Sequence, residues 1–297
     1  MTEDGGQPEQ AFDFTPIVRA VDAALSEYLD GLGLAGVLDS AVRYSLLGGG
    51  KRTRPVLAWL SAEAVGGVGE ASLPAGAAIE LVHAFSLVHD DLPAMDDDDL
   101  RRGRPTLHRH AGEAMAILAG DAMLAMAFGA TERIGDDALR ARVHAELIAG
   151  TVGMINGQVY DTAGAFDGEL SDEEKLRLIH RNKTGALIRA ACRVGGMLGG
   201  ADRKALESVT RFGELVGLQF QVMDDLLDVT ATADEMGKQT GKDEGAGKLT
   251  YPGVFGEERT RAIARELHSE ARGALEPLGE SAAGLRALAN RLASRSV

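Results

Sequence analysis

The sequence is poor in the residues that β-sheets and disulfide-linked folds require. Aromatic residues make up 4% of the 297 residues, Cys192 is the single cysteine, and no convincing run alternates apolar with polar side chains. One cysteine excludes an internal disulfide and suits a reducing cytoplasm. Long segments instead repeat apolar residues at the spacing of a helix. We therefore predict an all-α protein.

The sequence also lacks the patterns of leader and membrane-spanning segments. No basic segment followed by an apolar one opens the chain, so we expect no signal peptide. No run of about 18 uncharged apolar residues occurs, so we expect neither a membrane-spanning helix nor stable membrane insertion. The net charge of −14 argues against a nucleic-acid partner, because nucleic acid is itself anionic. Together these absences predict a cytoplasmic location.

Proline, glycine and capping residues divide the chain into helices. We expect a disordered tail over residues 1–12 and one domain over 13–297. Residues 229–253, rich in glycine, threonine, aspartate and lysine, are expected to form a functional loop that closes over the site. The expected helices cover about 15–32, 39–47, 55–65, 73–91, 112–134, 136–160, 171–180, a segment that reaches 198 after a break at 183–185, 202–228, 257–275 and 281–293.

Six aspartates lie within ten residues, at positions 90, 91 and 96–99. Carboxylates at this density repel one another unless a cation neutralises them, and hard divalent cations prefer oxygen ligands. Asp90 and Asp96 would not share a face of a straight helix, but Pro93 should end the helix and let Asp96 return to Asp90. We expect residues 97–99 only to balance charge or cap the loop. A solvated acidic loop is the alternative interpretation of the whole cluster.

A second acidic cluster favours the metal interpretation. Asp224 and Asp228 share one helix face, Asp225 flanks them, and the intervening residues are apolar. Two carboxylate triplets in one chain indicate a divalent-cation site built from both. An EF-hand is rejected, because the run from Asp96 lacks the central glycine. Zinc is rejected as well, because the histidines have no metal-type spacing with cysteine.

The segment Gly48–Pro55 combines three glycines with Lys51, Arg52 and Arg54 just before a helix. Helix N-termini and basic side chains bind phosphate groups, although a solvated basic turn is an equally good interpretation of this segment alone. It is not a Walker A loop, because Arg52 stands where serine or threonine belongs. With two cation sites, the segment predicts a cavity for diphosphate oxygens.

The ordered motifs GGGKRTRP, HAFSLVHDDLPAMDDDDLRRGRPT, ILAGDAML, KTG, FQVMDDLLD and GKLTYP resemble those of the trans-isoprenyl diphosphate synthases, or polyprenyl synthetases. The resemblance covers about residues 15–295 and is closest to bacterial farnesyl diphosphate synthases. It implies a single-domain bundle of roughly ten core helices around a deep central cavity. It also implies a homodimer that uses about three Mg2+ ions per site to join isopentenyl diphosphate to an allylic diphosphate, dimethylallyl or geranyl.

The resemblance also assigns roles to residues. It implies that Asp90, Asp96 and Asp224 bind Mg2+, with Asp91, Asp225 and Asp228 as supporting ligands. The allylic diphosphate would be held by Arg101, Lys183, Lys238 and Lys248, with Thr184 and Gln221 beside the allylic carbon. Isopentenyl diphosphate would be held by Lys51, Arg54, His83 and Arg102. Catalysis would fall to Lys183, Thr184, Gln221, Asp90 and Asp224.

Product length is expected to depend on the two residues at the floor of the cavity. Phe85 lies five residues before Asp90, about 7.5 Å along a helix, and by resemblance an aromatic side chain there blocks growth beyond C15. Its small neighbour Ser86 keeps C20, and hence a geranylgeranyl diphosphate synthase, open. A class I terpene cyclase is disfavoured by the second aspartate motif and by GGGKRTRP, and a noncatalytic synthase subunit by the presence of both aspartate motifs.

Overall fold

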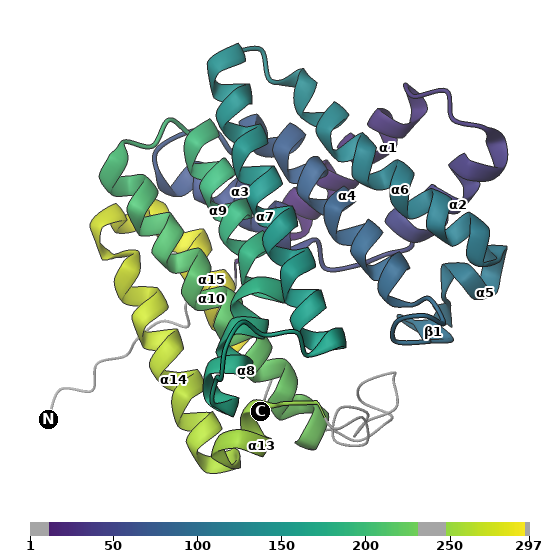
Figure 1. Ribbon diagram of the computed structural model, residues 1–297. Coiled ribbons are helices and arrows are strands. Elements are labelled where there is room, and N and C mark those ends of the chain that lie inside the picture. The colour runs from purple at the N-terminus through teal and green to yellow at the C-terminus, as the bar shows by residue number, and fades with distance from the viewer. Residues whose placement is uncertain (1–11, 231–247, 295–297) are drawn as a thin grey trace, which may run out of the picture.

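The computed structural model describes residues 12–230 and 248–294, and it confirms the all-α prediction (Figure 1). In chain order the α-helices are α1 (Thr15–Asp30), α2 (Gly36–Leu46), α3 (Thr53–Ala64), α4 (Leu73–Asp90), α5 (Leu107–Ala111), α6 (Glu113–Ala130), α7 (Asp137–Ala163), α8 (Asp172–His180), α9 (Ala186–Leu198), α10 (Arg203–Thr230), α13 (Tyr251–Phe255), α14 (Glu257–Ala274) and α15 (Ala283–Ala293). Short helical turns join them at η1 (Gly69–Ser72), η2 (Thr131–Arg133), η3 (Arg181–Gly185) and η4 (Glu276–Ala282).

Helix α4 occupies the interior and ends at the first acidic cluster. It packs most extensively on α6 and also contacts α1, α3 and α9, while α10 packs on α9 and α14 (Figure 1). Leu81 and Val82 on α4 are fully buried, as are Val216 and Val222 on α10. The two helices that carry the aspartates are therefore held rigidly by core packing, which fixes where their C-terminal ends meet solvent.

Close backbone contact between α3 and α9 depends on glycine. A Cβ atom at Gly195 would lie 2.0 Å from the carbonyl oxygen of Ala58, and one at Gly199 would lie 2.6 Å from that of Ala62. Such distances are far below van der Waals contact, so any larger residue would push the helices apart. This contact holds α9, and with it the turn η3 that precedes it, close to α3.

Several helix boundaries agree with the expected capping signals. Pro16 and Pro74 stand in the first turns of α1 and α4, and Ser171 with Glu174 forms the capping box that starts α8. The expected break near residues 183–185 is a π-helical turn, η3. These boundaries follow from local chemistry, because each end satisfies backbone groups that the helix leaves unpaired.

Other expectations were wrong in detail. Helix α2 begins at Gly36 and so contains Asp39 instead of being capped by it. The expected loop over residues 229–253 is shorter, because α10 continues to Thr230 and α13 begins at Tyr251. Most of that loop, and residues 1–11 of the expected disordered tail, lie outside the described residues. Phe12 is described, and its ring packs against that of Phe14 at a tilt of 39°, with a centroid distance of 4.8 Å.

A short hairpin after the first acidic cluster was not anticipated. Strands β1 (Leu100–Arg101) and β2 (Arg104–Pro105) pair antiparallel. The two residues between them, Arg102 and Gly103, have φ angles of 55° and 71°. Positive φ at both central positions is the geometry of a tight hairpin turn, which glycine adopts freely and arginine does not. The hairpin separates the side chains of Arg101 and Arg102.

Among the described residues, two helical segments are apolar and long enough to cross a membrane, by length and composition alone. They are Gly69–Asp90, of which 67% is buried within the protein, and Glu113–Arg133, of which 44% is buried. The first contains α4, an interior helix whose apolar side chains are packed in the core. The second contains α6, which keeps an exposed apolar side.

Candidate active site

The first acidic cluster forms a loop that closes back on the end of α4, as its sequence predicts. The backbone N–H of Asp96 donates a 2.9 Å hydrogen bond to the carbonyl oxygen of Asp90, across the turn that contains Pro93. Thr106 fastens the far end of this loop by donating to the carbonyl oxygen of Asp98 at 2.7 Å. Asp97 and Asp99 face Arg109, which agrees with the expectation that they balance charge.

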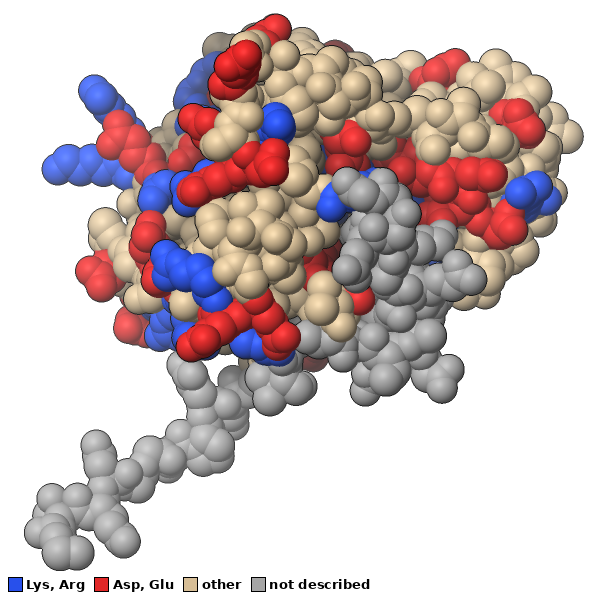
Figure 2. All heavy atoms as spheres, turned by 60° about the horizontal axis from the view of Figure 1, so that its bottom comes forward, with Lys and Arg blue, Asp and Glu red and all other residues tan. Residues whose placement is uncertain are grey.

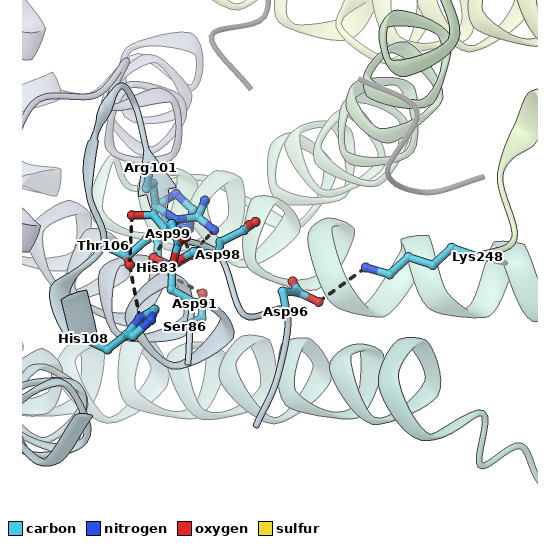
Figure 3. A network of polar contacts seen from close by, with 10 residues as sticks. All are labelled: His83, Ser86, Asp91, Asp96, Asp98, Asp99, Arg101, Thr106, His108 and Lys248. Atoms are coloured by element: carbon cyan, nitrogen blue, oxygen red, sulfur yellow. Dashed lines mark hydrogen bonds and ion pairs between the residues drawn. The ribbon is translucent and has the colours of Figure 1, made fainter. Parts of the chain in front are cut away.

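Asp91 is engaged by Arg101, in the network drawn in Figure 3. Nε of Arg101 lies 2.8 Å from Oδ1 and 2.9 Å from Oδ2 of Asp91, and Nη2 lies 2.6 Å from Oδ1. Burial raises the pKa of Asp91, and the hydrogen bonds from Arg101 oppose that rise. Bidentate contacts of this kind fix the guanidinium plane. Asp91 therefore fixes the orientation of the Arg101 side chain beside the first acidic cluster.

The surroundings of Asp90 disfavour its negative charge, as expected where a cation binds. Burial raises its pKa to about 6; Lys183 acts against this rise, and the neighbouring Asp96 adds to it. A carboxylate with a raised pKa is one that its surroundings do not fully compensate. A bound cation would supply that compensation.

Lysines connect the first cluster to α7 and to the segment before α13. Nζ of Lys248 lies 3.4 Å from Oδ1 of Asp96 (Figure 3) and 3.8 Å from Oδ2 of Asp161. The same Oδ2 of Asp161 accepts a 2.6 Å hydrogen bond from Nζ of Lys183. Residues from four separate parts of the chain thus meet here. Asp161 was missed by sequence reasoning, since it is a lone carboxylate at the end of a helix.

The π-helical turn η3 (Arg181–Gly185) presents Lys183 and Thr184 from consecutive positions. A Cβ at Gly157 of α7 would lie 2.0 Å from the backbone nitrogen of Lys183, so the turn packs directly on the glycine backbone. A π-helical turn widens the helix by one residue and is common at functional sites. It allows Lys183 to face Asp161 while Thr184 faces α10.

The second acidic cluster is tied to η3 and α13 through Asp225 and Gln221. The hydroxyl of Thr184 donates to Oε1 of Gln221 at 2.7 Å, and Nε2 of Gln221 donates to Asp225 at 3.3 Å. Asp225 is 4% exposed and also accepts the backbone N–H of Tyr251 at 2.9 Å. These bonds fix the amide of Gln221 and the start of α13 relative to α10. Asp224 and Asp228 are half-buried on the same helix.

A cationic pocket lies between α2, α3, α4 and the hairpin, and it adjoins the first cluster at Asp91 and Arg101. Its lining includes Arg52, His83, Arg101 and Arg102. Arg54 lies on the adjoining first turn of α3, where its Nε is buried and has no hydrogen-bond partner among the described residues. Burial lowers the pKa of Arg54, and burial together with nearby guanidinium groups lowers that of His83. An unsatisfied buried donor is costly, so this pocket has the chemistry of an anion site.

The remaining predicted residues are placed as follows. Lys51 is exposed and directly precedes Arg52, which lines the pocket. Phe85 is 6% exposed, and its ring meets His89 edge-on at 5.8 Å, while the hydroxyl of Ser86 donates to the carbonyl oxygen of His83. Lys238 lies outside the described residues. Figure 2 turns this end of the molecule forward and shows the acidic side chains spread across it.

Mg2+ fits the oxygen donors of these clusters. Within residues 12–230 and 248–294, no three histidine, cysteine, aspartate or glutamate side chains already converge on one point. Mg2+ differs from Ca2+ in that one or two carboxylates suffice, with water and substrate phosphates supplying the remaining ligands. The raised pKa of Asp90 and the nearby carboxylates of Asp91 and Asp96 fit that arrangement.

Comparisons with known proteins agree with this geometry. The family model described as polyprenyl synthetase matches residues 35–276, and members of this family generally use Mg2+. Geranylgeranyl pyrophosphate synthase 11, chloroplastic, from Arabidopsis thaliana is 44% identical over 305 residues, covering 96% of this chain and 83% of its own.

Two solved structures share the fold over nearly their full length. The geranyltransferase of Legionella pneumophila has a TM-score of 0.83 at 31% identity, covering 95% of this chain and 96% of its own. The FPP/GFPP synthase of Zymomonas mobilis has a TM-score of 0.82 at 31% identity, covering 94% of this chain and 98% of its own. The resemblance stated from the motifs is therefore confirmed: the chain belongs to the polyprenyl synthetase family and is a trans-prenyltransferase.

Proposed function

We propose that this enzyme condenses isopentenyl diphosphate head-to-tail with dimethylallyl and geranyl diphosphate, releasing diphosphate and giving farnesyl diphosphate as its main product. The observation that carries the proposal is the presence of two adjoining sets of charged groups, with Asp91 and Arg101 of the first also in the lining of the second. Carboxylates and lysines of the loop after α4, η3 and α10 form one region, and the arginine-rich pocket beside α3 forms the other. A two-substrate condensation needs one region for each diphosphate.

The first region would bind the allylic diphosphate. Asp90, Asp96 and Asp224 would hold Mg2+, about three ions per site by family resemblance, which when bound neutralises the diphosphate leaving group. Lys183 and Lys248 already point into this region, and each ammonium group has three donors, so it could bind diphosphate oxygens while Asp161 holds it in place. Arg101, oriented by Asp91, would add a bidentate contact.

The chain's polar atoms would then assist cleavage of the allylic C–O bond, whose electron pair leaves with the diphosphate. Gln221 and Thr184 are joined by a 2.7 Å hydrogen bond, and their oxygens would stabilise positive charge that develops on the allylic carbon. Asp225 holds the Gln221 amide so that its oxygen keeps this direction. Fixed dipoles of this kind stabilise charge without having to reorganise.

The second region would hold isopentenyl diphosphate through Lys51, Arg54, His83 and Arg102. The unpaired Nε of Arg54 is a donor ready for a phosphate oxygen. With its diphosphate anchored, the C=C bond of this substrate attacks the allylic carbon, and a C–C bond forms. A proton then leaves the new chain, and the released diphosphate is the base that takes it.

The product assignment depends on Phe85. Its ring is buried on α4, five residues before Asp90, and meets His89 edge-on, which supports its role as the floor that stops growth at C15. Geranylgeranyl diphosphate is the second candidate product, because the 44% identical relative bears that name. Ser86 beside Phe85 leaves room for the longer chain.

We further propose that the enzyme is a homodimer formed through α6 and α7. Ile148, Val152, Ile155 and Val159 recur at helical spacing on one face of α7 and are 43–50% exposed. Ile117 and Leu118 on α6 are 45% and 55% exposed. An apolar face of this extent is typical of a protein interface, and a second copy of the chain is the partner that the resemblance implies.

Purified enzyme incubated with Mg2+, isopentenyl diphosphate and each allylic starter tests the function. Mass spectrometry of the products should show a C15 diphosphate from both dimethylallyl and geranyl diphosphate, with inorganic diphosphate released in step. Loss of turnover with EDTA, and its return with Mg2+, is the matched metal control. Absence of diphosphate release with every starter contradicts the proposal, and cyclised hydrocarbons would indicate a cyclase.

A further inference from the structure

Glu80 is a buried carboxylate inside the cationic pocket to which no role has been assigned above. It lies on α4, one helical turn before His83, and is 3% exposed. Its Oε1 accepts a 2.8 Å hydrogen bond from Nη1 of Arg52, whose side chain is itself 3% exposed. Charged groups this deeply buried are retained only when they are paired. The pair sits beside the residues proposed to hold isopentenyl diphosphate.

Every nitrogen of the Arg52 guanidinium is used. Besides Nη1 on Glu80, Nε lies 2.7 Å from Oδ1 of Asp22 on α1, and Nη2 donates to the carbonyl oxygen of Leu46 on α2 at 2.7 Å. Arg52 therefore joins α1, α2 and α4 at one point. With five N–H groups in a planar fork, arginine has the geometry that such a junction needs.

The backbone of Arg52 is held in an unusual conformation. It has φ 48° and ψ 34°, the left-handed region that residues other than glycine avoid, and it stands immediately before the first turn of α3. Such a conformation persists only when surrounding contacts fix it. Lys51 and Arg54 lie one residue before and two residues after this point. The anchored side chain of Arg52 thus fixes the backbone from which Lys51 and Arg54 extend beside the pocket.

Glu80 also supplies the negative charge that lets several guanidinium groups share the pocket. Burial works to lower the pKa of Arg52, but the carboxylates of Glu80 and Asp22 together outweigh it and the pKa is raised. Burial lowers the pKa of Arg54 and of Arg102, and Glu80 acts against that in both. Glu80 therefore acts on three arginines at once, while contacting the hydrogen-bond donors of only one.

We propose that Glu80, acting through Arg52, is a positioning residue for isopentenyl diphosphate: it holds the turn that aims Lys51 and Arg54 and keeps the guanidinium cluster assembled before substrate arrives. The inference rests on the proposed function, because it takes the pocket to be the isopentenyl diphosphate site. Glu80 itself touches no substrate. Its effect should appear in the binding of one substrate and not of the other.

The test compares the KM values of the two substrates in full-length variants with Mg2+. Glu80→Gln keeps the shape and removes the charge, so KM for isopentenyl diphosphate should rise about 10-fold or more, since displacement of a positioned group has large effects. KM for the allylic diphosphate should change less than about twofold, and Glu80→Asp should recover part of the loss. Equal rises in both KM values, or no rise in either, overturn the inference.

A double variant separates positioning from stability. Replacing a buried ion pair by apolar residues often restores stability, so Arg52→Met/Glu80→Leu should regain much of the Tm that Glu80→Gln loses. If KM for isopentenyl diphosphate returns to normal with the Tm, Glu80 is only structural and the inference fails. A KM that stays high in the double variant supports positioning. Should Glu80→Gln not fold, the double variant and Glu80→Asp carry the same comparison.

Two controls keep the outcomes distinct. Glu146→Gln removes the 2.6 Å ion pair with Arg193 between α7 and α9, away from the pocket, and should lower Tm without changing the ratio of KM values. Arg54→Met tests the pocket itself. If Arg54→Met leaves KM for isopentenyl diphosphate unchanged, the proposed pocket is wrong and the inference falls with it. If Arg54→Met raises that KM but Glu80→Gln does not, only the inference is wrong.

Discussion

Asp161 and Lys183 form a 2.6 Å ion pair between α7 and the π-helical turn, and Lys248 lies 3.8 Å from the same carboxylate oxygen. One carboxylate thus gathers two lysines that are 65 positions apart in the chain. The relationship gives Asp161 a defined task, which is to hold both ammonium groups where the allylic diphosphate is expected.

Asp161→Asn should lower kcat/KM for the allylic diphosphate about 10- to 100-fold, because the lysines lose the group that positions them. KM for isopentenyl diphosphate should be almost unchanged. Initial rates with each substrate varied in turn measure the two effects. Asp172→Asn, which removes the exposed pair between Asp172 and Lys175 on α8, is the matched control and should leave both kinetic parameters unchanged. An unchanged allylic kcat/KM in Asp161→Asn contradicts the assignment.

Phe85→Ala should lengthen the product, because it removes the ring proposed to block chain growth below Asp90. Mass spectrometry should show C20 and longer diphosphates where the parent enzyme makes C15. The substitution should also lower the free energy of unfolding by about 3–5 kcal/mol, as expected for truncating a buried phenylalanine. Phe212→Ala, at a fully buried site on α10, is the control for stability alone. Identical product lengths in the parent enzyme and Phe85→Ala would show that Phe85 does not limit product length.

Val152→Lys should convert the proposed homodimer into monomers, since a charge would be buried at the centre of the apolar face of α7. Size-exclusion chromatography with light scattering reads the mass directly. Val37→Lys on α2 introduces the same charge at a residue that is 70% exposed and away from this face, and should not change the mass. A monomeric parent enzyme at all concentrations tested contradicts the proposed interface.

Stability should fall as the pH drops below the ordinary histidine pKa, with His83 as one source. Burial, followed by nearby guanidinium groups, lowers the pKa of His83 well below 6.5 in the folded protein. Above pH 6.5 neither the folded nor the unfolded chain binds this proton. Below it only the unfolded chain does, so His83 costs about 1.4 kcal/mol of unfolding free energy per pH unit.

His83→Gln should remove that contribution. Urea unfolding near pH 7.5 and near pH 5.5 should show a drop about 1.4 kcal/mol smaller in the variant than in the parent. His268→Gln, at a less buried histidine on α14, should change the drop by less. Parallel pH dependence of parent and His83→Gln would show that His83 is not held neutral.

The features that the sequence predicted correctly have local causes. The end of α4 before Pro93, the return of Asp96 to Asp90 and the capping box at Ser171 each follow from residues within one or two turns. The roles carried over from the family remain predictions for the experiments above, as does the cytoplasmic location. Residue types and spacing were sufficient to predict the end of α4, the return of Asp96 and the capping box, because local hydrogen bonding decides these features.

The features that sequence reasoning missed depend on contacts between distant segments. Asp161 acquires its significance only because Gly157 lets η3 approach α7. The hairpin turn at Arg102 was missed as well, because arginine rarely adopts positive φ. No periodicity or motif in one segment reports such pairings, because the partner is chosen by tertiary packing.

The π-helical turn Arg181–Gly185 makes the active site sensitive to chain length at one point. It holds one residue more than an α-helical turn would, and Lys183 and Thr184 meet Asp161 and Gln221 only in that register. Deleting a single residue there would let α8 and α9 merge into an ordinary helix and turn one relative to the other by about 100°. Evolution of this enzyme can therefore tolerate substitutions in the turn more readily than insertions or deletions.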